Sequence, residues 1–380
     1  LARQYGFQEV HTPILERAEV FSRPLGESSD VVGKEMYLLT DRGGDMLALR
    51  PEGTASIVRA LLSNGLTDKL PWKVFYAGPM FRYERPQKGR YRQFHQLGVE
   101  NIGGASPWED AEGILLAQCY LTSLQIETIL EINTLGDAAS RIAYKEALVS
   151  YFTQKHASLS PLSRHRLEQN PLRILDSKEP EDQDLIRHAP LLDDFLTPEA
   201  RTFFETLRTG LQALGISYRH NPRLVRGLDY YTHTVFEFVP STGEGGTVLA
   251  GGRYDNLVAL MGGPAIPGFG WAAGIERLLR VATIKEDVRR SIAVLAVGPY
   301  ESDVYACARL LRSKNHITEV SCGKDLGKLL KKADKSNARY AVIIGEEEKR
   351  AGVVLVKDLD QRTQERMPIA SLEKFVVNLV

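Results

Sequence analysis

The sequence is poor in cysteine and lacks any long apolar run. Its 380 residues include three cysteines, Cys119, Cys307 and Cys322, which are isolated and form no Cys-x-x-Cys pair. This spacing argues against a disulfide framework and a thiolate zinc site and fits a reducing compartment, so we expect a cytoplasmic protein. No apolar stretch approaches the length of a membrane span and no signal-peptide pattern opens the chain, so we expect a soluble protein with no membrane partner.

Net charge is also absent, since lysine plus arginine and aspartate plus glutamate both number 48. Any nucleic-acid binding must therefore come from local basic patches rather than from the charge of the whole chain. The length allows two or three domains with sizeable cores. No internal repeat or low-complexity tract is present, which argues against a solenoid or a disordered protein.

Charged and aromatic residues are most concentrated around residues 81–100. Strand-like residues at 73–84 and 91–100 flank a turn with a proline and a glycine, a pattern that predicts a β-hairpin with an irregular tip. One face of such a hairpin would combine guanidinium groups, an aromatic ring, an amide and an acid, which suits a nucleotide together with a small zwitterion. A charged, solvent-facing hairpin is the alternative, and it is the commoner meaning of an arbitrary basic hairpin. Period-2 alternation assigns this face to Arg82, Glu84, Arg92, Phe94, Gln96, Gly98 and Glu100.

The order of residues in this hairpin favours the binding interpretation. Residues 82–94 follow the pattern Arg-x-Glu-Arg-Pro-x-x-Gly-Arg-x-Arg-Gln-Phe. This pattern resembles motif 2 of class II aminoacyl-tRNA synthetases, and in particular that of the histidyl-tRNA synthetase family. The resemblance implies an α+β fold: an antiparallel sheet flanked by helices, with a helical insertion and a C-terminal α/β anticodon-binding domain.

Three further segments resemble motifs of the same family. Residues 226–231, Arg-Gly-Leu-Asp-Tyr-Tyr, match the phrase that separates this family from other class II enzymes. They lie in a segment, 224–239, whose residues predict a strand, and alone they could form an ordinary aromatic-lined part of it. Residues 247–255 resemble its second histidine-specific segment. Residues 267–279 resemble motif 3; a dinucleotide-binding glycine run is the weaker alternative, because no βαβ pattern surrounds it.

The start of the chain resembles the end of motif 1, which builds the dimer interface in the family. Residues 6–13 predict a short edge strand after a helix end. Family members usually carry a further N-terminal stretch, so we expect a truncated start, and a homodimer by resemblance. We divide the chain into a catalytic core at 1–135 and 219–282, a mostly helical insertion at 136–218 and an anticodon-binding domain at 291–380.

The insertion and the C-terminal region each leave two interpretations open. In the family, an insertion at this place packs towards the acceptor end of the tRNA, but from sequence a helical cover for the sheet fits equally. Alternating strands and helices after Ser291, including helices at 325–336 and 371–379, predict a compact α/β module behind a linker at 283–290. Five lysines on one side of the first of these helices form either a solvated face or a contact to the phosphates of tRNA: Lys324, Lys328, Lys331, Lys332 and Lys335.

Roles for individual residues follow from matching them to the family's motifs. From sequence alone, Thr54 is a candidate cap for the helix that follows it, and Glu52 is a favourable charge near that helix's N-terminus. The resemblance instead assigns both to the amino group of the substrate. The expected histidine-binding residues are Glu52, Gly53, Thr54, Arg82, Gln96, Glu100, Arg226, Tyr230, Tyr231 and Tyr254. The expected ATP-binding residues are Arg82, Glu84, Arg90, Arg92, Phe94 and Arg277, and the expected catalytic residues are Arg82, Arg226 and Arg277.

The resemblance implies ATP-dependent activation of L-histidine and its transfer to tRNA(His). No cluster of side chains predicts a metal site, and Mg²⁺ is expected to accompany ATP. One alternative is a catalytically inactive paralogue that serves as the regulatory subunit of ATP phosphoribosyltransferase. Such paralogues generally lack the appended domain and lose parts of the phrase at 226–231, both of which this sequence keeps. The same phrase argues against a prolyl or threonyl enzyme.

Overall fold

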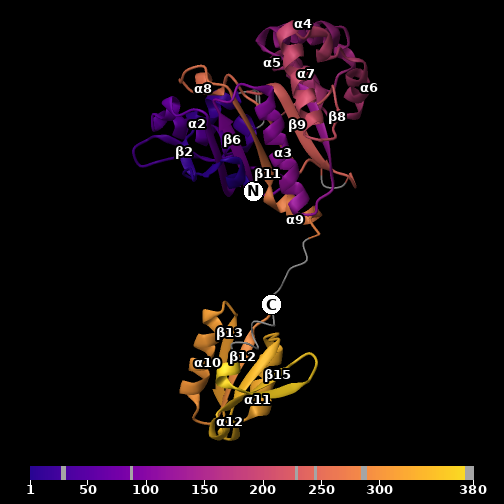
Figure 1. The fold of residues 1–380 in the computed structure, drawn as a ribbon. Helices are drawn as coiled ribbons and strands as arrows, with labels where there is room; N and C mark the ends of the chain where they lie inside the picture. Colours follow the sequence, from indigo (N-terminus) through magenta and orange to yellow (C-terminus); the bar gives the residue numbers. More distant parts are fainter. Residues whose placement is uncertain (27–30, 86–88, 227–229, 244–245, 284–288, 373–380) are drawn as a thin grey trace. The chain divides into compact units, whose positions relative to one another are not determined.

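The computed structural model describes residues 1–26, 31–85, 89–226, 230–243, 246–283 and 289–372. The chain divides into two compact units, residues 1–284 and 285–380 (Figure 1). Four predicted features lie wholly or partly outside the described residues: the hairpin tip at 86–88, the phrase at 226–231, of which 227–229 are not described, the linker at 283–290 and the C-terminal helix at 371–379.

The first unit is built on an eight-stranded sheet. Its two outermost pairs, β1 with β5 and β7 with β8, are parallel, and all other neighbours are antiparallel. The predicted fold class is thereby confirmed. In spatial order the strands are β1 (Gln8–Glu9), β5 (Trp72–Phe81), β6 (Gln93–Ile102), β11 (Gly268–Gly274), β10 (Leu249–Arg253), β9 (Thr232–Pro240), β7 (Thr128–Thr134) and β8 (Arg219–His220).

The structure decides between two interpretations of one segment of this sheet and corrects one predicted strand. The glycine-rich run at 268–274 is the antiparallel strand β11, which excludes the dinucleotide-binding alternative. The strand predicted to start at Leu224 starts only at Thr232, although Tyr230 and Tyr231 have high strand propensity. Residues 224–226 instead approach the sheet as irregular chain.

Helices cover the sheet through two hydrophobic cores. The first joins α3 (Pro107–Ser123), α7 (Pro198–Ala213) and α9 (Ile275–Val281) to buried rings of the middle strands, such as Phe236 and Trp271. The second joins α1 (Glu19–Leu25), α2 (Thr54–Ser63) and α8 (Leu257–Leu260) to residues such as Tyr76 and Val74. A small sheet lies beside them, in the order β2 (Leu15–Arg17), β4 (Met46–Leu49), β3 (Leu38–Thr40).

Helices α4 (Ala138–Gln154), α5 (Pro161–Gln169) and α6 (Pro180–His188) group together (Figure 1) and share a hydrophobic core of their own. Prolines at the first positions of α5, α6 and α7 start these helices, because a proline there loses no helical hydrogen bond. By contrast, α7 packs on α3, through Phe204, Leu207 and Leu211. The remaining short turns are η1 (Ala2–Tyr5), η2 (Val31–Glu35), η3 (Leu66–Asp68), η4 (His156–Ser158), η5 (Pro171–Asp176) and η6 (Leu192–Phe195).

Hydrogen bonds join the two ends of this helical group, at Asp137 and Thr197, and we call this junction its neck. Asp137 caps α4 by accepting from the Ser140 N–H at 2.8 Å, and its other oxygen accepts from the Thr197 hydroxyl at 2.6 Å. The Thr197 N–H donates to the Ser140 hydroxyl at 2.9 Å. The chain therefore leaves the sheet and returns toward it at one point.

The second unit is an α/β module with a five-stranded sheet. Strands β12, β13 and β14 are parallel, and β15 and β16 continue the sheet antiparallel. Helix α12 and strand β16 were not predicted from the sequence. In spatial order the strands are β13 (Thr318–Gly323), β12 (Ile292–Val297), β14 (Tyr340–Ile344), β15 (Val353–Asp358) and β16 (Gln364–Pro368); the helices are α10 (Glu301–Ser313), α11 (Leu326–Lys335), α12 (Glu346–Ala351) and the turn η7 (Ile369–Ser371).

Among the described residues, none of the helices has both the length and the apolar character needed to cross a membrane.

Candidate active site

A cavity of about 570 Å³ opens over the middle strands of the eight-stranded sheet. Strands β5, β6, β10 and β11, the start of α2 and the start of α9 all contribute to its lining. Twelve of the predicted site residues lie here, although they come from segments more than 200 positions apart. They are Glu52, Thr54, Arg82, Glu84, Arg90, Phe94, Gln96, Arg226, Tyr230, Tyr231, Tyr254 and Arg277.

The β5–β6 hairpin supplies an aromatic ring and an amide to the cavity. Phe94 and Gln96 are two positions apart on β6, so both point to the same face. The Arg82 guanidinium lies 5.3 Å from the centre of the Phe94 ring, and its Nε donates to the Pro51 carbonyl at 2.9 Å. Within the described part of the chain, the buried Oε1 of Gln96 has no hydrogen-bond partner, which leaves it free to accept from a ligand.

The start of α2 presents a buried carboxylate. The oxygens of Glu52 accept from the backbone N–H groups of Thr54 at 2.7 Å and Ala55 at 2.8 Å. Gly53 is the N-cap, and Thr54 makes no side-chain cap, so the prediction that Thr54 caps this helix is wrong. Burial raises the pKa of Glu52, while these hydrogen bonds and the nearby Arg82 lower it. A ligand ammonium at this point would stabilise the ionised form.

Glu100 lies beneath the lining of the cavity, with only 1% of its surface exposed. Its carboxylate accepts from the hydroxyls of Thr54 at 2.7 Å and Tyr76 at 3.4 Å, and also from the Tyr254 hydroxyl. Burial raises its pKa to about 8 against the lowering effect of these hydrogen bonds. An acid that is partly protonated near neutral pH therefore lies below the floor of the pocket.

Glycines make room for this buried layer. A Cβ on Gly270 of β11 would lie 1.9 Å from Oε2 of Glu100, and one on Gly53 would lie 2.3 Å from the Tyr76 ring. Gly53 itself is outside the cavity lining. The structure therefore gives Gly53 a packing role, in addition to the ligand contact predicted from the sequence.

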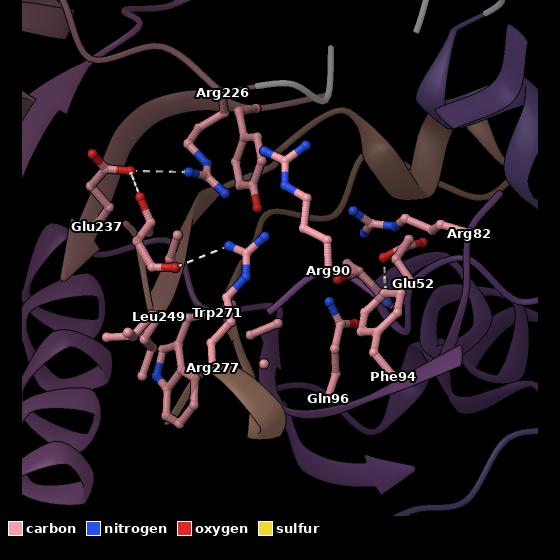
Figure 2. Close-up of a pocket in the computed structure, with 18 of the residues that line it drawn as sticks. Glu52, Arg82, Arg90, Phe94, Gln96, Arg226, Glu237, Leu249, Trp271 and Arg277 are labelled. Atoms are coloured by element: carbon pink, nitrogen blue, oxygen red, sulfur yellow. Dashed lines mark hydrogen bonds and ion pairs between the residues drawn. The ribbon is translucent and has the colours of Figure 1, made fainter. Parts of the chain in front are cut away.

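Three arginines gather at one end of the pocket, as Figure 2 shows for Arg90, Arg226 and Arg277. Arg277 lies in the first turn of α9 and donates to the carbonyls of Thr247 at 3.1 Å and Gly89 at 3.4 Å. Burial and then the neighbouring Arg90 lower the pKa of Arg277. Crowded cations of this kind favour a polyanion, because its charge offsets their mutual repulsion.

Acidic side chains offset part of this positive charge. Arg226 pairs with Glu237 at 3.4 Å, and Glu237 also accepts from the Thr247 hydroxyl at 2.7 Å (Figure 2). Glu84 lies 3.4 Å from Arg90 as an ion pair. Glu237 was not predicted as a site residue, because nothing in a single strand residue signals which cation it will face. Thr247 opens the second histidine-specific segment, but no individual role was predicted for it.

Arg92 lies outside the cavity lining, unlike the other predicted ATP-binding residues. Its guanidinium sits over the Tyr83 ring, 4.1 Å from the ring centre. The ladder of the hairpin ends at Phe81 and Gln93, so the period-2 rule that assigned Arg92 to the pocket face does not reach it.

A buried ion pair beside the site was not predicted from the sequence. Arg253, 1% exposed, binds Asp110 of α3 through two nitrogens and also reaches Asp255 at 3.0 Å and the Gly104 carbonyl at 2.9 Å. It connects β10, which lines the cavity, to the helix behind the sheet. Arg253 stands next to Tyr254 in the second histidine-specific segment, which was the one available signal.

Within the described ranges, no group of three or more His, Cys, Asp or Glu side chains is arranged to hold a metal ion.

An antiparallel sheet under an arginine-lined pocket, with an appended α/β unit, defines a class II aminoacyl-tRNA synthetase. The family model described as histidyl-tRNA synthetase matches residues 1–278, and the model described as anticodon binding domain matches residues 291–379. The chain belongs to the histidyl-tRNA synthetase family, and the resemblance predicted from its motifs is confirmed.

Individual relatives agree with this assignment. The chain is 52% identical to a protein of Gluconobacter oxydans (strain 621H) named histidine–tRNA ligase, over 98% of this chain and 91% of that protein. The structure of apo histidyl-tRNA synthetase from S. aureus superimposes with a TM-score of 0.79 at 32% identity, covering 98% of this chain and 92% of the other. A Bacillus halodurans structure described as an ATP phosphoribosyltransferase regulatory subunit/histidyl-tRNA synthetase gives 0.64 at 23% identity, with 90% of each chain covered, and shares the fold.

Proposed function

We propose that this cavity joins L-histidine to ATP to form histidyl-adenylate, and that the chain then transfers the histidyl group to tRNA(His). The observation that carries the proposal is the convergence, in one cavity, of a buried carboxylate, an arginine over an aromatic ring and three further arginines. These groups match the ammonium, the adenine and carboxylate, and the phosphates of the reactants.

Histidine would lie with its ammonium toward Glu52, Thr54 and Gln96. Glu52 provides charge and Gln96 provides a buried oxygen that has no partner among the described residues. The imidazole would be selected by Tyr231 and Glu100, because a neutral imidazole offers one donor and one acceptor. The Tyr254 hydroxyl donates to Glu100, so Tyr254 would connect this buried acid to the pocket surface.

ATP would lie across the arginines. Phe94 would stack on the adenine, Arg82 would hold both the histidine carboxylate and the α-phosphate, and Arg277 would hold the outer phosphates. A carboxylate oxygen of histidine attacks the α-phosphorus, the bond to the β-phosphate oxygen breaks, and pyrophosphate leaves. Arg226, on the other side, would stabilise the charge that develops at the α-phosphate. Positioning and neutralisation of charge account for such a step without a protein nucleophile.

Mg²⁺ is expected to enter with ATP. The side chain that fits this role is Glu84, whose buried Oε2 has no hydrogen-bond partner in the described part of the chain, although it lies 3.4 Å from Arg90. One or two carboxylates together with phosphate oxygens are the usual Mg²⁺ ligands. The bound ion would neutralise part of the phosphate charge.

In the second step, the terminal ribose hydroxyl of the tRNA attacks the carbonyl of the adenylate and AMP leaves. The C-terminal unit would contact the anticodon stem-loop through the lysines of α11, which lie opposite its buried Leu329 and Ala333. The chain would act as a cytoplasmic homodimer. Exposed apolar side chains on and beside the small sheet support a second copy there: Ile14, Leu15, Leu38, Leu39 and Met46.

The test is ATP–pyrophosphate exchange with purified protein and a panel of amino acids. Exchange that depends on histidine alone is expected, followed by charging of tRNA(His). Exchange driven by another amino acid would contradict the pocket assignment. A folded dimer without exchange would instead favour the regulatory paralogue. The Bacillus halodurans structure, at 23% identity, supports a shared fold for that alternative and carries no argument about activity.

Replacement of Glu100 gives a sharper test of histidine selection. We expect Glu100→Ala to lose histidine-dependent exchange, because it removes the acid that the pocket is built around. Glu100→Gln keeps the shape and serves as the companion variant if alanine impairs folding. Near-normal exchange in a folded Glu100→Ala protein would remove this residue from the histidine site.

A further inference from the structure

The first turn of α4 reaches back to the tyrosine that we assign to histidine recognition. Nη1 of Arg141 donates to the backbone carbonyl of Tyr231 at 2.9 Å. Arg141 is the fourth residue after the N-cap Asp137, near the end of the helix where the macrodipole disfavours a cation. The macrodipole of α4 therefore does not favour an arginine at this position, and the hydrogen bond to Tyr231 is one interaction that offsets this.

The carbonyl of Tyr231 needs a donor from outside the sheet. Strand β9 begins at Thr232, where the pairing with β10 shifts register between Gly252 and Arg253. Tyr231 is only 7% exposed, and buried backbone carbonyls are almost always hydrogen-bonded. Arg141 supplies this hydrogen bond with a charged donor, which makes a stronger bond than a neutral one.

The start of α4 is itself fixed against β9. The His233 N–H donates to the Gly136 carbonyl at 2.9 Å, and the Leu135 N–H donates to the His233 carbonyl at 2.6 Å. The position of Arg141 relative to Tyr231 is therefore set by the backbone on both sides of the contact.

The Tyr231 ring is buried in the hydrophobic core that joins α1, α2 and α8 to the sheet. Its centre lies 4.8 Å from that of the Tyr230 ring, and Gly252, which has no side chain, leaves room for the Tyr231 ring. Arg141 and Tyr231 also line a second cavity, of about 310 Å³, which shares Arg82, Arg226 and Arg277 with the first. The contact thus lies at the edge of the proposed reaction site.

We propose that Arg141 is a positioning residue: it holds the backbone at Tyr231 so that the tyrosine hydroxyl meets the imidazole of histidine. This inference rests on the proposed role of Tyr231. It gives the helical group a part in amino-acid selection, apart from any contact with tRNA.

A double-mutant cycle tests the inference, with Arg141→Met, Tyr231→Phe and the combination. ATP–pyrophosphate exchange gives the KM for histidine and for ATP. Each single substitution should raise the KM for histidine about tenfold. Arg141→Met removes the charge-assisted hydrogen bond that positions Tyr231, and Tyr231→Phe removes the hydroxyl contact that depends on it. The KM for ATP should change less than about twofold. The KM for histidine of the double variant should be close to that of either single variant, because both substitutions remove the same contact between the Tyr231 hydroxyl and the imidazole.

The controls separate positioning from stability. Arg201→Met removes another arginine that donates to a backbone carbonyl, that of Asp193 at 2.8 Å, and should leave both KM values unchanged. Arg141→Lys keeps one charged donor and should recover part of the histidine affinity. If Arg141→Met fails to fold, Arg141→Gln, which removes the charge, replaces it in the cycle.

Three outcomes overturn the inference. Additive effects in the cycle would show that Arg141 does not act through Tyr231. Equal changes in both KM values together with a lowered Tm would show a purely structural role. Wild-type exchange that does not depend on histidine would remove the proposed function itself, and it is recognised before any variant is made.

Discussion

Among single residues, Glu100 has the most unusual environment. Its carboxylate is buried and receives hydroxyl groups from three different segments of the chain. Burial raises its pKa from 4.5 to about 8, so the folded protein binds a proton that the unfolded chain releases. The stabilisation from this proton is complete below about pH 4.5 and is lost as the pH rises towards 8.

Comparison with a variant that cannot titrate isolates this effect. The Tm of the wild type, minus that of Glu100→Gln, should fall between about pH 5 and pH 8.5, with all other titrating groups cancelling in the difference. Scanning calorimetry or fluorescence-monitored melting of both proteins across this range measures it. A difference that stays flat would mean that Glu100 ionises at its ordinary pKa in the folded protein.

From the sequence, Glu100 was predicted as a site residue, but the side chains that surround its carboxylate were not predicted. Motif matching placed Glu100, Arg82 and Arg277 in one site, and the cavity brings the two arginines together with Glu100 directly below. It could not show that Tyr254 and Thr54 would donate to the same carboxylate, because those contacts join positions 46 and 154 residues away. Local pattern carries no information about such pairs.

At the scale of elements, β11 shows why its glycines matter. A methyl group on Gly270 would lie 1.9 Å from Glu100 and 2.6 Å from the Val99 carbonyl oxygen. Gly274, at the end of the same strand, would meet only the Arg277 side chain at 3.7 Å. Their positions in the sequence give no sign of this difference.

Alanine at these two positions should therefore have unequal effects. Gly270→Ala should lower the free energy of unfolding by about 1–3 kcal/mol, as for other overpacked cores, and should weaken histidine binding by moving Glu100. Gly274→Ala is the matched control and should unfold like the wild type. Denaturant unfolding and the KM for histidine provide the measurements; equal stability of the two variants would show that β11 has room to shift.

Helix α11 separates an apolar face from a cationic one. Replacing Lys328, Lys331 and Lys335 by glutamine should raise the KM for tRNA in charging and make its salt dependence shallower by about one unit per lysine that contacts a phosphate. Amino-acid activation needs no tRNA, so pyrophosphate exchange should not change. Arg350→Gln, at an exposed cation already paired with Glu346 at 2.8 Å, is the control. An unchanged KM for tRNA would leave this face as solvated surface.

Elements were predicted best where one periodicity persists. The hairpin of β5 and β6 follows from the alternation of its side chains, and its strands pair from Trp72 and Ile102 to Phe81 and Gln93. Strand β9 was predicted to start too early, because side-chain propensity at Tyr230 and Tyr231 carries no information about where the backbone finds its partners. The carbonyl of Tyr231 bonds to a guanidinium instead of a strand.

At the scale of the whole molecule, the small sheet of β2, β4 and β3 presents apolar side chains outward. Leu38 is 53% exposed and Met46 50% exposed, on neighbouring strands. We expect Leu38→Asp with Met46→Asp to shift the protein from dimer to monomer and to lower exchange activity. Analytical ultracentrifugation measures the mass. Asp substitutions at Ile142 and Leu162, two exposed apolar residues of the helical group, are the control and should leave the mass unchanged.

The closed neck of the helical group has a consequence for how such a molecule can change over time. Asp137 and Thr197 touch, so sixty positions of chain begin and end at a single point. A change in the length of the helices between them would leave this point, and the ends of β7 and β9 beside it, in place. Other contacts of the helical group to the rest of the unit include Arg223, which donates to the carbonyls of Ala189 and Pro190, and Arg141, which donates to Tyr231, so a change in the helices would be felt there.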